Sequence, residues 1–391
     1  RVLFRSFMFF GGLIMNKFLI TLATLVAFTL SGFAYAQSVS GQMQRIVGVG
    51  DDVDGGVAEQ FTRFVISADT TADNGWVVGG SMSIQTAATG GGTYAPSTNN
   101  MYVQTDMMTV NIGNTIGPAI TSVPAVNGMV PGGGVDAGYQ FLFDGGNLAS
   151  QGVGFREAYY AHNAAKIDID LPSVNGFTVG ASYTPSQEYS AGTQSRATNA
   201  VESSDHGEVI EVAVKYAGEL DGLSYNVGAA VLSGNSQSQI TGQASRVTAN
   251  NDLSSFSAGI KVTMGNMTVG LQGFDNGASF GASTDDVKAK HNGYNTAITW
   301  AMGNITLGVG YSHQELVRGT RAQDAAAAGN LPDAAAGNKR EDNITMIGLG
   351  YDMGGGISTY VQLSNNDHSD GDHATTEVDP QVLFAGINIG F

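Results

Sequence analysis

The stretch LSSFSAGIKVTMGNMTVGLQGFD, residues 253–275, carries the pattern that decides the fold. From Phe256 to Met264 an apolar residue stands at every second position, and Ser, Gly, Lys and Thr fill the positions between. This period of two indicates a β-strand with two unlike faces. The very short link Gly265-Asn266 then predicts an immediate return into a second strand. An apolar face opposite a small, polar face suits a wall between lipid and a water-filled lumen.

The same alternation recurs along most of the chain, clearly so in 177–183, 223–231 and 305–311. We expect an all-β protein, a transmembrane antiparallel β-barrel of sixteen strands, an even number as in single-chain bacterial barrels. The expected strands are 38–50, 59–70, 75–86, 99–105, 108–115, 162–171, 176–185, 207–216, 223–233, 253–264, 267–275, 291–301, 304–314, 340–352, 356–366 and 381–391.

The links between these strands alternate in length. Short links such as 106–107, 172–175 and 302–303 are followed by long polar links such as 186–206, 234–252 and 315–339. Outer-membrane barrels have short periplasmic turns and long outer loops, so the alternation favours that class. Aromatic residues at strand ends are typical of the girdles at both membrane surfaces. These are Tyr183, Tyr216, Tyr294, Trp300, Tyr311, Tyr351 and Phe391.

Composition excludes several classes of protein. The 391 residues include 34 Asp+Glu against 17 Lys+Arg, which gives a net charge of −17 and argues against a nucleic-acid-binding face. The absence of Cys excludes disulfides, thiol catalysis and cysteine-ligated metals. Apolar residues make up 42% with only 13% charged, which argues against disorder.

Residues 1–36 have the features of an export signal. They contain three bases and no acid, and an apolar run from Phe18 to Leu30 leads to Ala34-Tyr35-Ala36, a signal-peptidase pattern. Met15 is the natural start of such a peptide, so residues 1–14 are interpreted as upstream sequence. We expect cleavage after Ala36 and a mature barrel of residues 37–391. An uncleaved anchor is the alternative, but the apolar run is short for a spanning helix.

Three passages resemble the Gram-negative general porins, which are trimeric sixteen-stranded barrels. NNMYVQTDMMTVNIGN at 99–114 resembles the hairpin before the constriction loop of that family. KIDIDLPSVNGFTVGASY at 166–183 resembles its strand, Pro-Ser turn and next strand. VLFAGINIGF at 382–391 resembles the terminal strand, whose final Phe, here Phe391, is read by the outer-membrane assembly machinery.

The resemblance implies a homotrimer in the outer membrane of a Gram-negative bacterium, in contact with lipid and lipopolysaccharide. It implies passive diffusion of small hydrophilic solutes and ions, with no enzymatic activity, cofactor or metal. It also implies a third loop, roughly 116–161, folded into the barrel as a constriction. This segment is the longest without clear alternation, and such long loops are usually functional.

Charged side chains across a narrow aqueous gap set the ion preference of a pore. Arg63 resembles a constriction arginine of the family, although it shares its parity with Phe61 and Val65. Asp168 stands near a position where porins often carry another wall arginine, which puts anion preference in doubt and favours cations. Glu211, Lys215 and Lys261 also fall on lumenal parity. The candidate constriction residues are Arg45, Arg63, Asp136, Asp144, Glu157, Lys166, Asp168 and Asp170, with Arg156 as a weaker one.

Two other functions stay open from the sequence. One is a barrel with a plugged lumen that acts as an adhesin or surface receptor, and the other is a barrel hydrolase. A hydrolase needs a nucleophile with a paired base, and the sequence places none with confidence. The Asp and His residues of the last long link, around 367–373, could bind a metal, but a solvated polar loop is the simpler interpretation.

Overall fold

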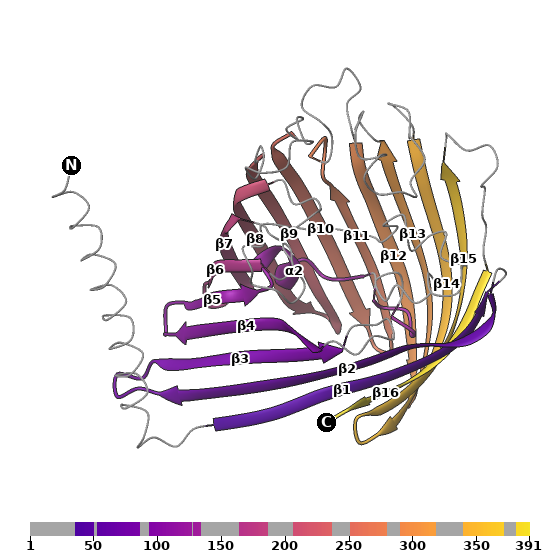
Figure 1. The fold of residues 1–391 in the computed structure, drawn as a ribbon, viewed down its shortest axis with the longest axis horizontal. Coiled ribbons are helices and arrows are strands. Elements are labelled where there is room, and N and C mark those ends of the chain that lie inside the picture. Colours follow the sequence, from indigo (N-terminus) through magenta and orange to yellow (C-terminus); the bar gives the residue numbers. More distant parts are fainter. Residues whose placement is uncertain are drawn as a thin grey trace, which may run out of the picture.

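The computed structural model forms one closed barrel of sixteen strands around a central lumen (Figure 1). Each strand pairs antiparallel with its neighbours along the chain, and β16 pairs with β1 to close the wall. The sequence prediction of an all-β antiparallel barrel with sixteen strands is confirmed. The residues described by the structure are 36–50, 53–86, 94–126, 128–133, 164–186, 206–236, 251–279, 290–317, 339–370 and 381–391.

The first half of the wall contains one short helix, which follows β5. Its elements are β1 (Ala36–Gly50), β2 (Val53–Thr71), β3 (Val77–Thr86), β4 (Tyr94–Gln104), β5 (Thr109–Thr115), α2 (Pro118–Ser122), β6 (Ala164–Asp170), β7 (Phe177–Ser186) and β8 (His206–Leu220). The second half is β9 (Leu223–Ser236), β10 (Leu253–Met264), β11 (Met267–Asp275), β12 (Lys290–Met302), β13 (Ile305–Val317), β14 (Lys339–Gly354), β15 (Ile357–Asp370) and β16 (Gln381–Gly390).

Strand positions follow the sequence pattern closely, and β10 and β11 have the expected bounds. The largest differences are at strand ends that face the long links. β2 and β4 begin earlier than expected, and β8 and β15 end later. Backbone pairing continues there although the apolar alternation has stopped, because ladder hydrogen bonds do not depend on the side chains.

The two faces of the wall differ in the way the alternation predicts. On β10, Phe256 and Ile260 point outward and are exposed, whereas Ser257 on the other face is buried. The same inversion holds around the barrel, with exposed Val, Leu and Ile outside and Ser, Asn and Gln inside. An apolar outer band and a polar interior are the arrangement of an outer-membrane barrel. No helix among the described residues is long and apolar enough to cross a membrane.

Two of the short turns are built on Asn-Gly and Asp-Gly pairs. Asn175 and Gly176 have φ of 52° and 87°, and Asp221 and Gly222 have φ of 50° and 80°. Two successive residues with positive φ form the tight turn that matches the twist of paired strands. The Asn-Gly pair after Pro172-Ser173 therefore reverses the chain between β6 and β7 as the sequence predicts.

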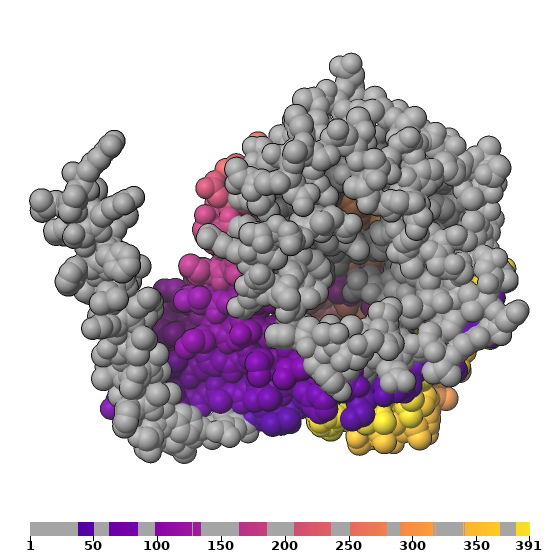
Figure 2. All heavy atoms as spheres, viewed as in Figure 1, coloured from indigo at the N-terminus to yellow at the C-terminus, as the bar shows by residue number. Residues whose placement is uncertain are grey.

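The barrel closes where the two ends of the chain meet. Phe391 and Gly41 exchange two backbone hydrogen bonds of 2.8 and 3.1 Å, which extends the β1–β16 ladder by one pair. The Phe391 ring lies over Gly41 and meets Phe64 edge-on at 5.8 Å. Figure 2 shows the N-terminal strands, indigo to purple, beside the yellow C-terminal strands along this seam.

Candidate functional site

The segment after β5 folds into the lumen and runs along the inner wall, as expected for a constriction loop. Ala119 and Val123, in and after α2, contact Ala213 of β8 and Leu232 of β9 (Figure 1). Further along, Val126 and Val130 join an apolar cluster with wall residues of β11, β12 and β14. The backbone N–H of Val126 donates a 2.8 Å hydrogen bond to the Gln272 side chain. Residues 117–133 are therefore fastened to the wall at several points.

Glycines on the lumenal face form the surface on which this segment lies. A side chain at Gly228 would collide with the Ser122 carbonyl, and one at Gly348 with the Pro131 carbonyl. The set spans six strands and consists of Gly180, Gly228, Gly259, Gly270, Gly308, Gly310, Gly348 and Gly350. The small inner face predicted from the sequence thus has a second role beside lining water, because it lets the loop backbone approach the wall.

Lys166 and Glu211 form a buried ion pair beside the start of the loop. The Lys166 ammonium donates to Glu211 Oε1 at 2.8 Å, and both side chains are fully buried. Glu211 Oε2 accepts a 3.4 Å hydrogen bond from the N–H of Ala119, in the first turn of α2. Lys166 is on the lumenal face as expected, but its charge is matched by Glu211. The sequence placed Glu211 on this face without revealing that it holds the loop.

Asp168 and Asp170 also take the lumenal positions expected for them on β6. Asp168 is 4% exposed, and its Oδ2 accepts a 3.1 Å hydrogen bond from Asn111 of β5. Asp170 Oδ1 lies above Gly180 of β7, close to Pro118. Both carboxylates therefore stand at the root of the constriction loop.

The two arginine candidates on β1 and β2 lie on opposite faces of the wall. Arg63 is opposite Gln42, which lines the lumen, so Arg63 also faces inward. Arg45 lies on the outer face with Met43 and Val47, and its guanidinium donates to the Gln44 carbonyl at 2.7 Å. The candidate role of Arg45 at the constriction is corrected by this placement, because alternation sends its side chain away from the lumen.

Three acidic candidates, Asp136, Asp144 and Glu157, fall in 134–163, outside the described residues, as does Arg156. Lys215 and Lys261 lie on the lumenal face, on the same parity as the buried Ala213 and Ser257. The described part of the lumen therefore holds bases on β2, β8 and β10 together with the acids on β6.

A cavity of about 470 Å³ lies between the loop residues 128–133 and the wall formed by β1 and β13–β16. Its lining is largely uncharged amides and hydroxyls, among them Gln42, Gln44, Thr306 and Asn388, with Asp352 as the acid. Gln44 donates a 2.8 Å hydrogen bond to the Tyr360 hydroxyl across the β1–β16–β15 seam. This space is polar and suits water and hydrophilic solutes.

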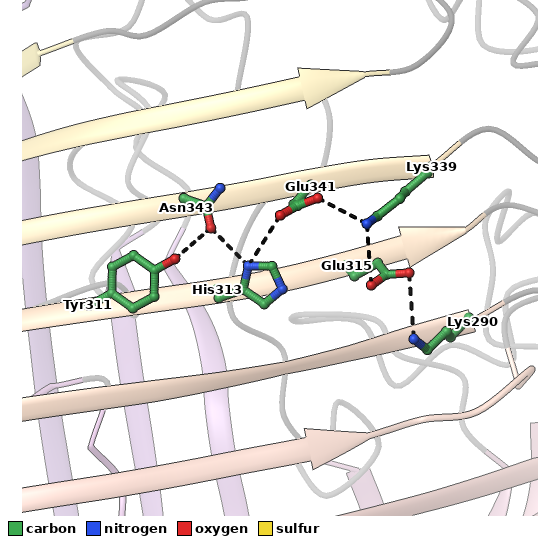
Figure 3. A network of polar contacts seen from close by, with 7 residues as sticks. All are labelled: Lys290, Tyr311, His313, Glu315, Lys339, Glu341 and Asn343. Carbon is green, nitrogen blue, oxygen red and sulfur yellow. Dashed lines mark hydrogen bonds and ion pairs between the residues drawn. The ribbon is translucent and has the colours of Figure 1, made fainter.

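A polar network on β12–β14 is separate from the lumen (Figure 3). Lys339 contacts Glu341 at 3.0 Å and Glu315 at 3.6 Å, and Lys290 contacts Glu315 at 3.5 Å. These residues share the parity of the outward-facing Ile347 and Trp300, so the network lies on the outer wall near the long links. It therefore does not contribute side chains to the pore.

The described residues contain no group of three or more His, Asp or Glu side chains placed to hold a metal ion. Of the last long link, Asp367 to Asp370 belong to β15, and residues 371–380 lie outside the described part. His291 contacts Asn276 at 3.0 Å, and His313 contacts Asn343 at 2.8 Å.

Comparison with solved structures finds barrels of the same fold. OmpT of Vibrio cholerae in its trimer form aligns over 92% of this chain and 100% of its own, with TM-score 0.59 and 12% identity. An anion-selective porin from Comamonas acidovorans covers 92% and 100%, with TM-score 0.60 and 13% identity. A mutant of the Rh. blastica porin covers 91% and 100%, with TM-score 0.55 and 16% identity.

No curated protein sequence shows significant similarity to the chain. The sequence model of the Gram-negative porins matches residues 21–371, which is most of the chain. This match agrees with the closed sixteen-stranded barrel and its inward loop. The chain therefore belongs to the Gram-negative porin family and is a protein of the outer membrane.

Proposed function

We propose that the barrel is a water-filled pore for passive diffusion of small hydrophilic solutes and ions. The observation that carries this proposal is the polar lumen narrowed by residues 117–133, which lie on the wall and leave a polar cavity beside them. Reconstitution in planar bilayers tests it, with stepwise conductance as the expected result. A silent, correctly folded barrel would contradict it and favour the plugged receptor.

A preference for cations is part of the proposal. Asp168 and Asp170 face the lumen, and Lys166, the base nearest to them in sequence, is already paired with Glu211. Asp136, Asp144 and Glu157 add negative charge to the same loop by sequence. An acidic passage concentrates cations and repels anions. A reversal potential in a KCl gradient measures this preference, and an anion-selective channel would contradict it.

We also propose a homotrimer with lipid and lipopolysaccharide around it. Arg45 supports this, because an arginine facing lipid costs about 2–4 kcal/mol at the membrane centre and less near the surfaces. A face shared with another subunit would remove Arg45 from lipid. Conductance steps in groups of three and a trimeric mass in detergent are expected. A monomeric mass with single steps would contradict the trimer.

We propose no enzymatic activity. In the described residues, His291 and His313 have amide partners, and Glu341 lies 3.8 Å from His313. A hydrolase would need a nucleophile oriented by such a base. Outer-membrane assembly through Phe391 and cleavage of the signal after Ala36 complete the proposal.

A further inference from the structure

We propose that Asp168, Asp170 and Ser182 form a binding site for a hard divalent cation of the calcium class at the root of the constriction loop. The site lies in the lumen of the proposed pore and so rests on the proposed function. Its ligands would be Asp168 Oδ1, Asp170 Oδ1 and Ser182 Oγ, with water completing the shell. Carboxylate and hydroxyl oxygens are the donors that such cations prefer.

Register brings these oxygens to one patch of the lumenal wall. Asp168 of β6 is directly opposite Ser182 of β7, and Asp170 is opposite Gly180. Directly opposed residues on one face of an antiparallel pair have Cβ atoms about 4.5–5.5 Å apart. Asp170 Oδ1 lies above Gly180, in the space that any side chain there would fill.

Two buried oxygens in this patch have no hydrogen-bond partner. Asp168 is 4% exposed and Ser182 is 5% exposed, yet Asp168 Oδ1 and Ser182 Oγ are both unpartnered. The Asn111 amide satisfies only Oδ2 of Asp168. Buried polar atoms are usually hydrogen-bonded, and two orphaned oxygens facing each other across a strand pair indicate a missing ligand.

The charge of the patch points to a cation. The charged groups acting on Asp168 are Asp170, Glu211 and Lys166. Together these residues are three carboxylates and one ammonium, and that ammonium is bonded to Glu211. Asp168 and Asp170 are therefore left without a basic partner among the described residues. Burying uncompensated carboxylates is unfavourable, and a bound cation would neutralise them.

Calcium titration by calorimetry tests the site, with trimer refolded from purified chain so that lipopolysaccharide is absent. We expect one ion per chain with a dissociation constant of about 10⁻⁴ to 10⁻³ M, the range of weak extracellular sites. Asp168→Asn and Asp170→Asn should each weaken binding about tenfold or more, because each removes a charged ligand. Asp106→Asn is the matched control, since Asp106 is exposed in the neighbouring turn and loses the same charge.

Ser182→Ala separates ligation from charge, because it removes one oxygen without altering the charge of the patch. We expect weaker calcium binding with unchanged assembly, so this variant decides the matter even if an aspartate variant fails to assemble. Calcium affinity unaltered by Ser182→Ala and by Asp168→Asn, or no binding to intact wild-type trimer, would overturn the site. Failure of the pore itself is distinguishable, because it appears as absent conductance whatever calcium does.

Discussion

At the scale of single residues, Lys166 and Glu211 show how a charge can be lumenal by parity and still be unavailable to a passing ion. Their side chains are fully buried and bonded to each other at 2.8 Å, and Glu211 also accepts from the first turn of α2. An ion pair of this kind positions the loop, whereas Asp168 and Asp170 are left to act on the lumen.

Removing one member of this pair should therefore cost more than removing both. Glu211→Leu or Lys166→Met alone should destabilise the barrel by about 3–5 kcal/mol, because a buried charge is left unpaired. The double variant should recover much of that loss. The temperature of the heat-modifiable shift on gels measures the effect, and Lys290→Met, in an exposed pair, should change little. Additive losses in the double variant would contradict this coupling.

Phe391 is the second residue with a specific expectation. Its backbone closes the ladder with Gly41, and an open strand edge in lipid leaves polar groups unsatisfied at several kcal/mol each. Deleting Phe391 should lower the outer-membrane yield of heat-modifiable trimer. Trp300→Ala, which removes an exposed aromatic far from the seam, is the control. An unchanged yield after the deletion would refute the assembly role.

At the scale of elements, the constriction depends on the fit between residues 117–133 and the glycines beneath them. Gly228 and Gly348 are close to backbone carbonyls of the loop, so the wall and the loop must be small at the same places. The loop gains close packing from this fit and loses freedom to move.

Gly348→Ala should loosen the loop, because the added methyl group collides with the Pro131 carbonyl. We expect a destabilisation of about 1–3 kcal/mol, typical of overpacking, with noisier single-channel current. Gly273→Ala is the matched control, since the atom nearest to its added methyl is 3.5 Å away. Equal behaviour of the two variants would show that the glycine surface does not seat the loop.

Shortening the loop tests its place in the pore. Deleting Gly128 to Gly146 should enlarge the conductance and admit larger sugars, because it removes residues that narrow the lumen. A deletion of the same length within 318–338 is the control and should leave the size limit unchanged. A size limit that survives the first deletion would place the constriction elsewhere.

At the scale of the whole molecule, the charge balance sets the expected selectivity. Residues 37–391 hold 14 bases against 34 acids once the three bases of residues 1–36 are set aside. The anion-selective Comamonas porin has the same fold, so selectivity follows from side chains and not from the barrel.

Changing Asp136 and Asp144 together to Asn should shift the reversal potential toward anions. The shift should be largest at low salt, because charges in an aqueous lumen are screened over about 10 Å at 0.1 M. Lys290→Gln on the outer wall should leave the potential unchanged. If the double variant matched the wild type at low salt, these two acids would not control the narrowest point.

The sequence by itself determined the class, the strand count and most strand positions, because period-two alternation and paired turns are local signals. It also determined which residues of β6 and β8 face inward. It left Arg63 uncertain and placed Arg45 wrongly among the constriction residues, since apolar neighbours do not reveal the face of an irregular strand.

Only the tertiary structure decided which lumenal groups act together. The pairing of Lys166 with Glu211, the orphaned oxygens of Asp168 and Ser182, and the glycines under the loop all join residues distant in sequence. Strand register and the path of the loop bring them together, and neither is encoded in a local period. Alternation specifies the face of a residue, whereas contact across the lumen depends on how the whole barrel closes.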